Sequence, residues 1–288
     1  MPEQDTAWGR WGEQDEVGAF NQLTARTARD AAALVRDGVV VALAQPLSGA
    51  TPAPANRCGF SHFMSRDGGD SVGRERRGQL GLADDAMVTP LHIGTHMDAL
   101  CHVWRGEQIY NGFPARSVRS VGALHCGIEK LPPFFGRGVL VDLIEHALAD
   151  GAAITATMIE DALRATGEAL QAGDAVLIRT GWLERQSTAA APDFNSEPGI
   201  DVGAADFLAA RGVALVGADN FAIEQMPFAP QDAFPVHQRL LCDFGIPLLE
   251  GLVLAPLAAF GRSSFLFVAA PLPIVGGTGS PVAPIAIL

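Results

Sequence analysis

The sequence lacks any run of lysines and arginines, and its formal net charge is −12. A chain of this charge repels the phosphates of nucleic acids and the headgroups of an anionic membrane. The segment SRDGGDSVGRERR carries several basic residues, but aspartate and glutamate stand among them. We therefore expect a small-molecule substrate, with neither nucleic acid nor a membrane surface as a partner.

Long apolar runs are missing as well. No stretch reaches the roughly 18 residues at which a spanning helix is expected, because the nearest candidate, LLEGLVLAPLAAF, is interrupted by Glu250 and Pro256. The first residues, MPEQDTAWGR, contain neither the basic nor the apolar region of a secretory signal. These absences predict a soluble protein of the cytoplasm.

Cysteines are few and scattered. Cys58, Cys101, Cys126 and Cys242 form no CxxC pair, so we interpret them as buried thiols and not as part of a zinc ribbon or thioredoxin-like site. The glycine motifs of nucleotide-binding proteins are also missing, and GGTGSP lacks the lysine and the following helix of a phosphate loop. GGTGSP is therefore interpreted as a structural turn.

The apolar pattern predicts one α/β domain over residues 1–288. Hydrophobic residues make up 48 % of the chain, which supplies a sizeable core. Helical spacing predicts helices at 23–35, 158–170 and 204–212, the second with a capping box at Thr157 and Glu160. Apolar runs predict strands at 39–47, 136–144, 174–182 and 213–220 and through much of the final third, including a strand-like run at 237–250.

The order of these elements has no regular βαβ rhythm, which favours a mixed, largely antiparallel sheet. Between residues 52 and 85 the composition shifts to glycine, serine, arginine and aspartate. We expect a long polar loop there, serving as a lid, a binding loop or an oligomer contact.

Side chains that could bind metal or transfer protons are concentrated in the segment HIGTHMDALCH, which holds three of the seven histidines. Gly94 disfavours a helix, so the segment is expected to run as a strand into a tight turn. His96 and Asp98, two residues apart in an extended chain, then point to the same side. With His92 they supply half or more of a site for Zn²⁺ or Mn²⁺, with positions left open for water.

Other histidines extend this hypothesis. His102, four residues beyond Asp98, is a candidate for a further ligand or for a proton carrier. His237 and Glu250 are candidates to complete the metal shell from across the fold, but their spacing leaves this open. The remaining histidines, His62, His125 and His146, stand alone and are interpreted as structural.

The segment HIGTHMDALCH resembles the signature HxGTHxDxPxH of the metal-dependent cyclase family, which includes bacterial kynurenine formamidase and isatin hydrolase. Every fixed position matches except the proline, which is Leu100 here. Further segments are similar to those of the longer members, namely WGEQDEVGAFN, GVLVDL, DAVLIRTGW, VALVGADN, HQRLLCDFGIPLLEGL and PLPIVGGTGSP. The resemblance thus extends over most of residues 8–288.

This resemblance implies a β-barrel-like sheet flanked by helices, the cyclase or kynurenine formamidase-like fold, assembled as a homodimer or homotetramer. It implies that His92, His96 and Asp98 bind metal, with Asp98 bridging two ions where two are present. His102 matches the proton-transferring histidine. His237 and Glu250 match the second-ion ligands of the formamidase, whereas isatin hydrolase-like members use one ion.

The implied activity is hydrolysis. A bound metal ion lowers the pKa of its water to about 7 and polarises a carbonyl, so that hydroxide attacks a small cyclic or aryl amide, lactam, lactone or ester. Two alternatives stay open: a metal-dependent lyase, dehydratase or cyclase, on a small carbonyl compound, and a non-catalytic, metal-stabilised binding protein.

Substrate-binding residues are less clearly indicated. Tyr110, the only tyrosine, closely follows the cluster, and Trp104 and Phe63 are further candidates to stack on a planar ring. Asp219 and Asn220 end a predicted strand, where they would either reach the rim of a pocket or form a simple turn.

Overall fold

The computed structural model describes residues 6–54, 56–73, 79–188 and 193–288. Its helices are α1 Ala25–Ala32, α2 Ala156–Thr166, α3 Trp182–Thr188, α4 Val202–Ala210, α5 Pro235–His237, α6 Ala255–Ala258 and the π-helix η8 Gln238–Phe244. Short 3₁₀ helices are η1 Gly18–Gln22, η2 Gly68–Ser71, η4 Tyr110–Gly112, η5 Ala115–Ser117, η6 Ile128–Lys130 and η7 Ile144–His146. Within these described ranges no helix has the length and apolar character that crossing a membrane requires.

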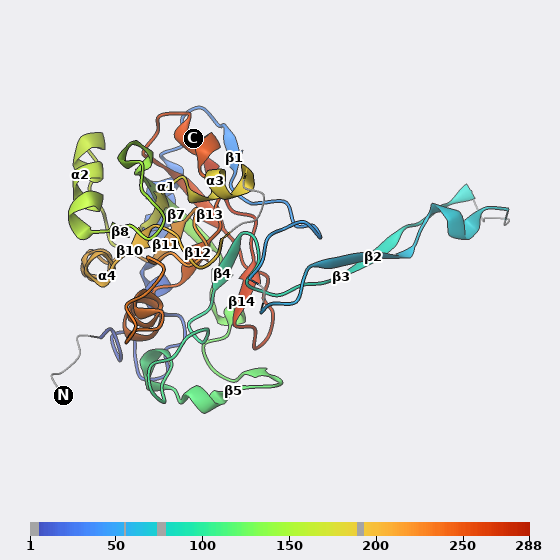
Figure 1. Ribbon diagram of the computed structural model, residues 1–288, viewed down its shortest axis with the longest axis horizontal. Helices are drawn as coiled ribbons and strands as arrows, with labels where there is room; N and C mark the ends of the chain where they lie inside the picture. The colour runs from blue at the N-terminus through green and yellow to red at the C-terminus, as the bar shows by residue number, and fades with distance from the viewer. Residues whose placement is uncertain (1–5, 55, 74–78, 189–192) are drawn as a thin grey trace.

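Nine strands form one curled sheet (Figure 1). In spatial order they are β1 Val40–Ala42, β15 Ile285–Ile287, β13 Ser264–Ala269, β7 Phe134–Asp142, β9 Ala175–Arg179, β11 Leu215–Ala218, β12 Leu248–Glu250, β4 His96–Asp98 and β14 Gly279–Pro281. The central strands β7, β9, β11 and β12 run parallel, and every other neighbouring pair in this sheet is antiparallel. The predicted fold class, a mixed and largely antiparallel sheet with flanking helices, is confirmed.

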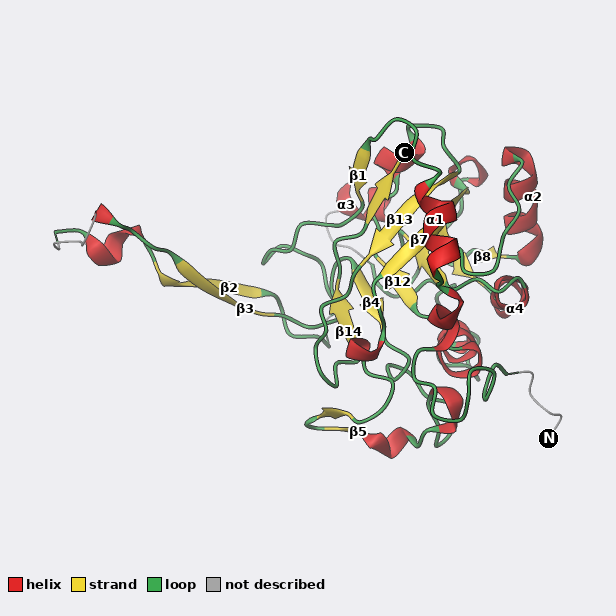
Figure 2. Cartoon of the chain, turned by 180° about the vertical axis from the view of Figure 1, so that it is seen from behind, coloured by secondary structure: helices red, strands yellow, loops and turns green. Residues whose placement is uncertain are grey.

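The parallel centre of the sheet explains the uninterrupted apolar runs. Parallel strands are usually covered on both faces, so their side chains need not alternate between apolar and polar. Every residue of β11 and β12 is buried, as is all of β9 except Arg179. Helix α1 packs over β7 and β13, as Figure 2 shows, while α2 contacts both α4 and β7. The sheet therefore passes through the middle of the core.

Two local predictions are wrong. Helix α2 begins two residues earlier than expected, because Thr155, and not Thr157, accepts the hydrogen bond from the Met158 amide. Strand β8 ends at Ile154, so Thr155 is the first extended residue available to cap the helix. The run at 237–250 is strand only at β12, because Pro235 starts a helix that continues through η8.

The segment at 52–85 is not simply a loop. It contains β2 Ser61–Arg66, paired with β3 Asp84–Val88 in an antiparallel hairpin that projects from the body of the molecule (Figure 1). Every residue of both strands is exposed. The polar composition concealed this pairing, because the strands bury no face that would impose an alternating pattern. Two further short pairs lie elsewhere, β5 Val118–Arg119 with β6 Gly122–Ala123 and β8 Ala153–Ile154 with β10 Gly199–Ile200.

The cysteine prediction holds for three of the four residues. Cys101, Cys126 and Cys242 are buried, but Cys58 is exposed, because it lies just before the projecting hairpin. All four thiols are free.

A partly buried ion pair joins β7 to the start of β9. Arg137 donates from Nε and Nη2 to the two carboxylate oxygens of Asp174, each at 3.0 Å, and the two side chains are 17 % and 3 % exposed. Asp174 also accepts the amide hydrogen of Gln171 at 2.7 Å. This bidentate contact compensates a carboxylate that is otherwise withdrawn from water.

We expect Arg137→Ala to lower the free energy of unfolding by about 3 kcal/mol, because it leaves Asp174 buried without its charge partner. Urea denaturation followed by circular dichroism measures this change. The matched control is Arg164→Ala, which removes an exposed pair with Asp161 and should cost less than about 1 kcal/mol. Equal effects of the two substitutions would contradict this interpretation.

Candidate metal centre

Strand β4 supplies the framework of the site. It lies between β12 and β14, and its register places His96 directly opposite Glu250. In an extended strand His96 and Asp98 share one face, and cross-strand partners share it too. The predicted turn before this strand is present, with Gly94 at φ +56°. The three potential ligands His96, Asp98 and Glu250 therefore meet on one face of the sheet.

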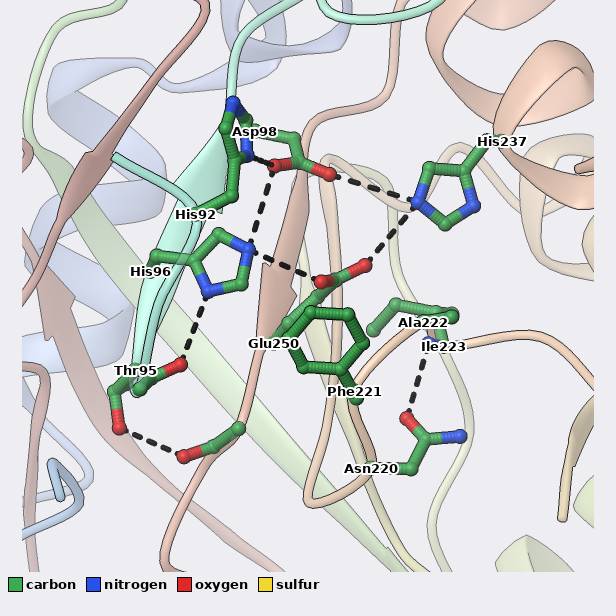
Figure 3. A network of polar contacts seen from close by, with 12 residues as sticks. His92, Thr95, His96, Asp98, Asn220, Phe221, Ala222, Ile223, His237 and Glu250 are labelled. Atoms are coloured by element: carbon green, nitrogen blue, oxygen red, sulfur yellow. Dashed lines mark hydrogen bonds and ion pairs between the residues drawn. The ribbon is translucent and has the colours of Figure 1, made fainter. Parts of the chain in front are cut away.

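The first group of potential ligands is His92, His96 and Asp98. Asp98 Oδ1 lies 2.6 Å from His92 Nδ1 and 3.7 Å from His96 Nε2 (Figure 3). The other ring nitrogen of His96, Nδ1, lies 3.0 Å from the Gly94 carbonyl oxygen, to which it donates in its protonated form. That bond leaves Nε2 facing the carboxylates.

The second group is Asp98, His237 and Glu250. His237 Nε2 lies 3.6 Å from Asp98 Oδ2 and 3.2 Å from Glu250 Oε1 (Figure 3). The other oxygen, Glu250 Oε2, lies 3.1 Å from His96 Nε2. Asp98 thus faces three imidazoles and Glu250 faces two, and Asp98 belongs to both groups. The structure brings together all five residues predicted as metal ligands.

Charge in this interior is balanced between carboxylates and imidazoles. Burial would raise the pKa of Asp98, but the nearby His102 and His92 rings hold it well below its usual range. Burial would lower the pKa of His96, but the Glu250 and Asp98 carboxylates raise it. The site therefore favours positive charge placed between its carboxylates.

Three atoms of the cluster are buried without a hydrogen-bond partner in the described part of the chain: His96 Nε2, Asp98 Oδ2 and Glu250 Oε1. Buried polar atoms are normally paired. All three are ligand atoms of the types that Zn²⁺ and Mn²⁺ accept. The donor set therefore fits a divalent cation, with His92, His96 and Asp98 as one ligand set and Asp98, His237 and Glu250 as another.

His102 lies beside these groups without belonging to either. Its ring stacks on that of His92, with centroids 3.8 Å apart and planes inclined by 24°. Within the described residues its ring makes no hydrogen bond. Burial lowers the pKa of His102 to about 3, so its imidazole is neutral near pH 7. A neutral, unpaired imidazole can accept a proton.

An aromatic cleft of about 950 Å³ borders the cluster. Its wall includes Phe194, Phe221, Phe228 and Phe234. The Phe221 ring lies 6.2 Å from that of His96, and the Phe234 ring lies 5.1 Å from that of His237. The sequence analysis missed these rings, although three of them follow the predicted strand at 213–220 within one proline-rich stretch.

Arg57 also lines the cleft. Its guanidinium donates a hydrogen bond to the carbonyl oxygen of His92 and lies 5.0 Å from the centre of the Phe221 ring. Arg57 thereby joins the wall of the cleft to the metal-binding segment. No motif in the sequence marks this arginine, because its partners are distant along the chain.

The aromatic residues predicted to bind substrate lie elsewhere. Tyr110 is fully buried, donates from its hydroxyl to Asp15 at 2.9 Å and packs against Gly245. Phe63 is on the projecting hairpin, and Trp104, 49 % exposed, is not among the residues that line the cleft. The prediction for Tyr110 is wrong, because sequence proximity to the cluster did not determine where the ring points.

Asp219 and Asn220 shape the backbone and do not reach a pocket rim. Both are fully buried. Asp219 accepts hydrogen bonds from the amides of Thr180 and Gly181 and from the Thr180 hydroxyl, at 2.7–2.8 Å. Asn220 donates to the Pro198 carbonyl at 2.7 Å and accepts the Ile223 amide hydrogen at 3.0 Å. Of the two readings left open by the sequence, the turn is correct.

A buried cluster of imidazoles and carboxylates, with a spare histidine and an aromatic cleft beside it, defines a candidate divalent-metal site. The cyclase family model matches residues 23–225, and the chain belongs to this family. That match includes the whole of HIGTHMDALCH and ends before His237. The family expected from the signature is confirmed.

The chain is similar to the isatin hydrolase of Roseibium aggregatum, with 28 % identity over 222 residues that cover 70 % of this chain and 73 % of the relative. A solved structure of a novel cyclase is 36 % identical, with a TM-score of 0.92 over 99 % of this chain and 100 % of that one. Isatin hydrolase A from Labrenzia aggregata, bound to benzyl benzoate, shares the fold with a TM-score of 0.65, 23 % identity and coverage of 93 % and 98 %.

Gly279, on β14, leaves the space that His92 occupies. A Cβ atom at this position would lie 2.6 Å from His92 Cε1 and 2.8 Å from the Met97 carbonyl oxygen. Neither distance is compatible with van der Waals contact, so the imidazole or the strand would have to move. The first group of ligands therefore depends on a residue without a side chain on the neighbouring strand.

We expect Gly279→Ala to displace His92, to lower the free energy of unfolding by about 1–3 kcal/mol and to weaken zinc binding. Calorimetric titration of the metal-free protein with Zn²⁺ measures the binding. Gly49→Ala, where nothing lies within 4 Å of the new Cβ, is the control and should leave both quantities unchanged. Wild-type zinc affinity in Gly279→Ala would show that His92 does not need this space.

Proposed function

We propose that the chain is a metal-dependent hydrolase that cleaves a small cyclic or aryl amide, lactam, lactone or ester. The observation that carries this proposal is His102, a neutral imidazole left unpaired beside two buried ligand groups that share Asp98. A purely structural metal site would have no use for a spare proton carrier. The proposed cofactor is Zn²⁺ or Mn²⁺, one or two ions per chain.

A bound divalent cation would supply Lewis acidity toward the substrate carbonyl and lower the pKa of a water molecule. The protein contributes the remaining functions. The His92, His96 and Asp98 side chains would hold the cation in a buried interior, where its charge would act strongly. His102 takes a proton at a ring nitrogen and returns it to the leaving nitrogen or oxygen of the substrate.

The cleft supports a substrate with a planar, apolar ring. Phenylalanine rings that line a cleft stack well on such a ring and exclude water from it. Phe221 and Phe234 each lie beside a histidine of the cluster, so a ring held between them would place an attached carbonyl near the ligand groups. This arrangement supports acyl compounds of the isatin type, lactams included, as substrates.

We expect His102→Ala to keep the metal of the wild type and to lose turnover by about 10²- to 10⁴-fold, the usual contribution of a general acid–base residue. Elemental mass spectrometry gives ions per chain, and a panel of aryl amides, isatin-like lactams, lactones and esters gives turnover. His96→Ala should lose metal and turnover together, while His146→Ala, an exposed histidine, should lose neither.

The other outcomes separate the competing functions. A product lighter than its substrate by one water would indicate a lyase, because hydrolysis adds a water. Metal that raises the melting temperature without turnover of any substrate would indicate a binding protein. Full turnover in His102→Ala would remove the role assigned to this histidine.

We also propose that the chain forms a homo-oligomer through the β2–β3 hairpin. The hairpin carries apolar side chains on both faces, Phe63 and Val88 on one and Met64 and Met87 on the other, and all are exposed. An isolated two-stranded hairpin is only marginally stable in water. A second copy of the chain would cover these side chains, as a homodimer or a homotetramer requires.

We expect light scattering after size-exclusion chromatography to report a dimer or tetramer for the wild type and a shift toward monomer for the double variant Phe63→Ser and Met64→Ser. The substitutions remove apolar surface from both faces of the hairpin, which weakens its burial against another chain. Val121→Ser, exposed but on a different part of the surface, should keep the wild-type mass. A monomeric wild type would refute the proposal.

A further inference from the structure

A carboxylate outside both ligand groups holds the imidazole of His237. Glu224 Oε1 lies 2.5 Å from His237 Nδ1 and accepts the backbone amide hydrogen of the same residue at 3.0 Å. Glu224 Oε2 accepts the amide hydrogen of Val236, also at 3.0 Å. The Glu224 side chain is buried, so water does not compete for these bonds.

This contact determines which ring nitrogen of His237 faces the cluster. A neutral imidazole that donates from Nδ1 carries its lone pair on Nε2. His237 Nε2 points toward Asp98 Oδ2 and Glu250 Oε1, the two carboxylate oxygens of the cluster that lack a hydrogen-bond partner among the described residues. The ring is thus turned as a cation ligand requires.

Glu224 is itself held firmly. Its own loop is fixed by Glu197, which accepts the amide hydrogens of Phe221 and Ala222 at 2.9 and 2.7 Å. The start of α5 has no side-chain cap from Phe234, so the two amides that Glu224 binds would otherwise lack acceptors. One carboxylate therefore fixes both the helix that carries His237 and the rotation of its ring.

We propose that Glu224 is a positioning residue, which sets the orientation of His237 and thereby the affinity of the ligand group Asp98, His237 and Glu250 for its cation. The inference rests on the proposed metal-dependent function. Carboxylates that bind the second nitrogen of a ligand histidine typically contribute about 10- to 100-fold to metal affinity. Among the described residues Glu224 forms no hydrogen bond or ion pair with Asp98 or Glu250, so we expect its effect to pass through His237.

The experiment is calorimetric titration of the metal-free protein with Zn²⁺, combined with zinc content by elemental mass spectrometry. In the wild type we expect two ions per chain, and Glu250→Ala identifies the ion held by the second group. Glu224→Gln should bind that same ion about 10- to 100-fold more weakly and leave the other unchanged. The matched control is Glu197→Gln, which alters a buried carboxylate that binds the same loop through the backbone amides of Phe221 and Ala222.

Four results would overturn the proposal. The first is wild-type affinity of Glu224→Gln for both ions. The second is a loss of zinc affinity in Glu197→Gln as large as that in Glu224→Gln, since the effect would then come from the integrity of the loop and not from the imidazole. A wild type with one ion, unaffected by Glu250→Ala, would refute this inference and leave a single-ion hydrolase intact. A wild type that binds no zinc would refute the proposed function as well. Glu224→Asp, which keeps the charge, gives the same readout if Glu224→Gln does not fold.

Discussion

The structure depends on burying the Asp98 carboxylate. A carboxylate with no exposed surface needs compensation at both oxygens, and here His92 lies against Oδ1 while His237 faces Oδ2. The carboxylate is withdrawn from water because β4 is an interior strand, with β12 on one side and β14 on the other. The same pairing brings Glu250 opposite His96 and leaves room for His92 over Gly279.

The loop after β11 connects the ligand cluster with the aromatic cleft. Phe221 forms part of the cleft wall, and three residues later Glu224 holds His237. Asp219 and Asn220, at the start of this loop, are fully buried and fix its backbone. Residues that first suggested a pocket rim therefore act indirectly, by placing the side chains that line the cleft and orient a ligand.

The local sequence predicted secondary structure best where a single effect, such as burial of a strand on both faces, decides the conformation. The continuous apolar runs of β7, β9 and β11 were recognisable, because strands buried on both faces need no polar alternation. The start of α2 was misplaced by two residues, since two threonines compete for the cap and the end of β8 decides between them. Tyr110 shows a further limit: its packing against Gly245 joins segments more than a hundred residues apart.

By itself, the sequence determined that His92, His96 and Asp98 lie close together with His102 nearby, because they share eleven residues and an extended chain places His96 and Asp98 on the same side. Only the tertiary structure decided that His237 and Glu250 join them, that Glu224 turns the His237 ring, and that phenylalanines rather than Tyr110 line the cleft. The physical reason is that strand pairing and helix packing bring together residues from distant parts of the chain, which no local pattern records.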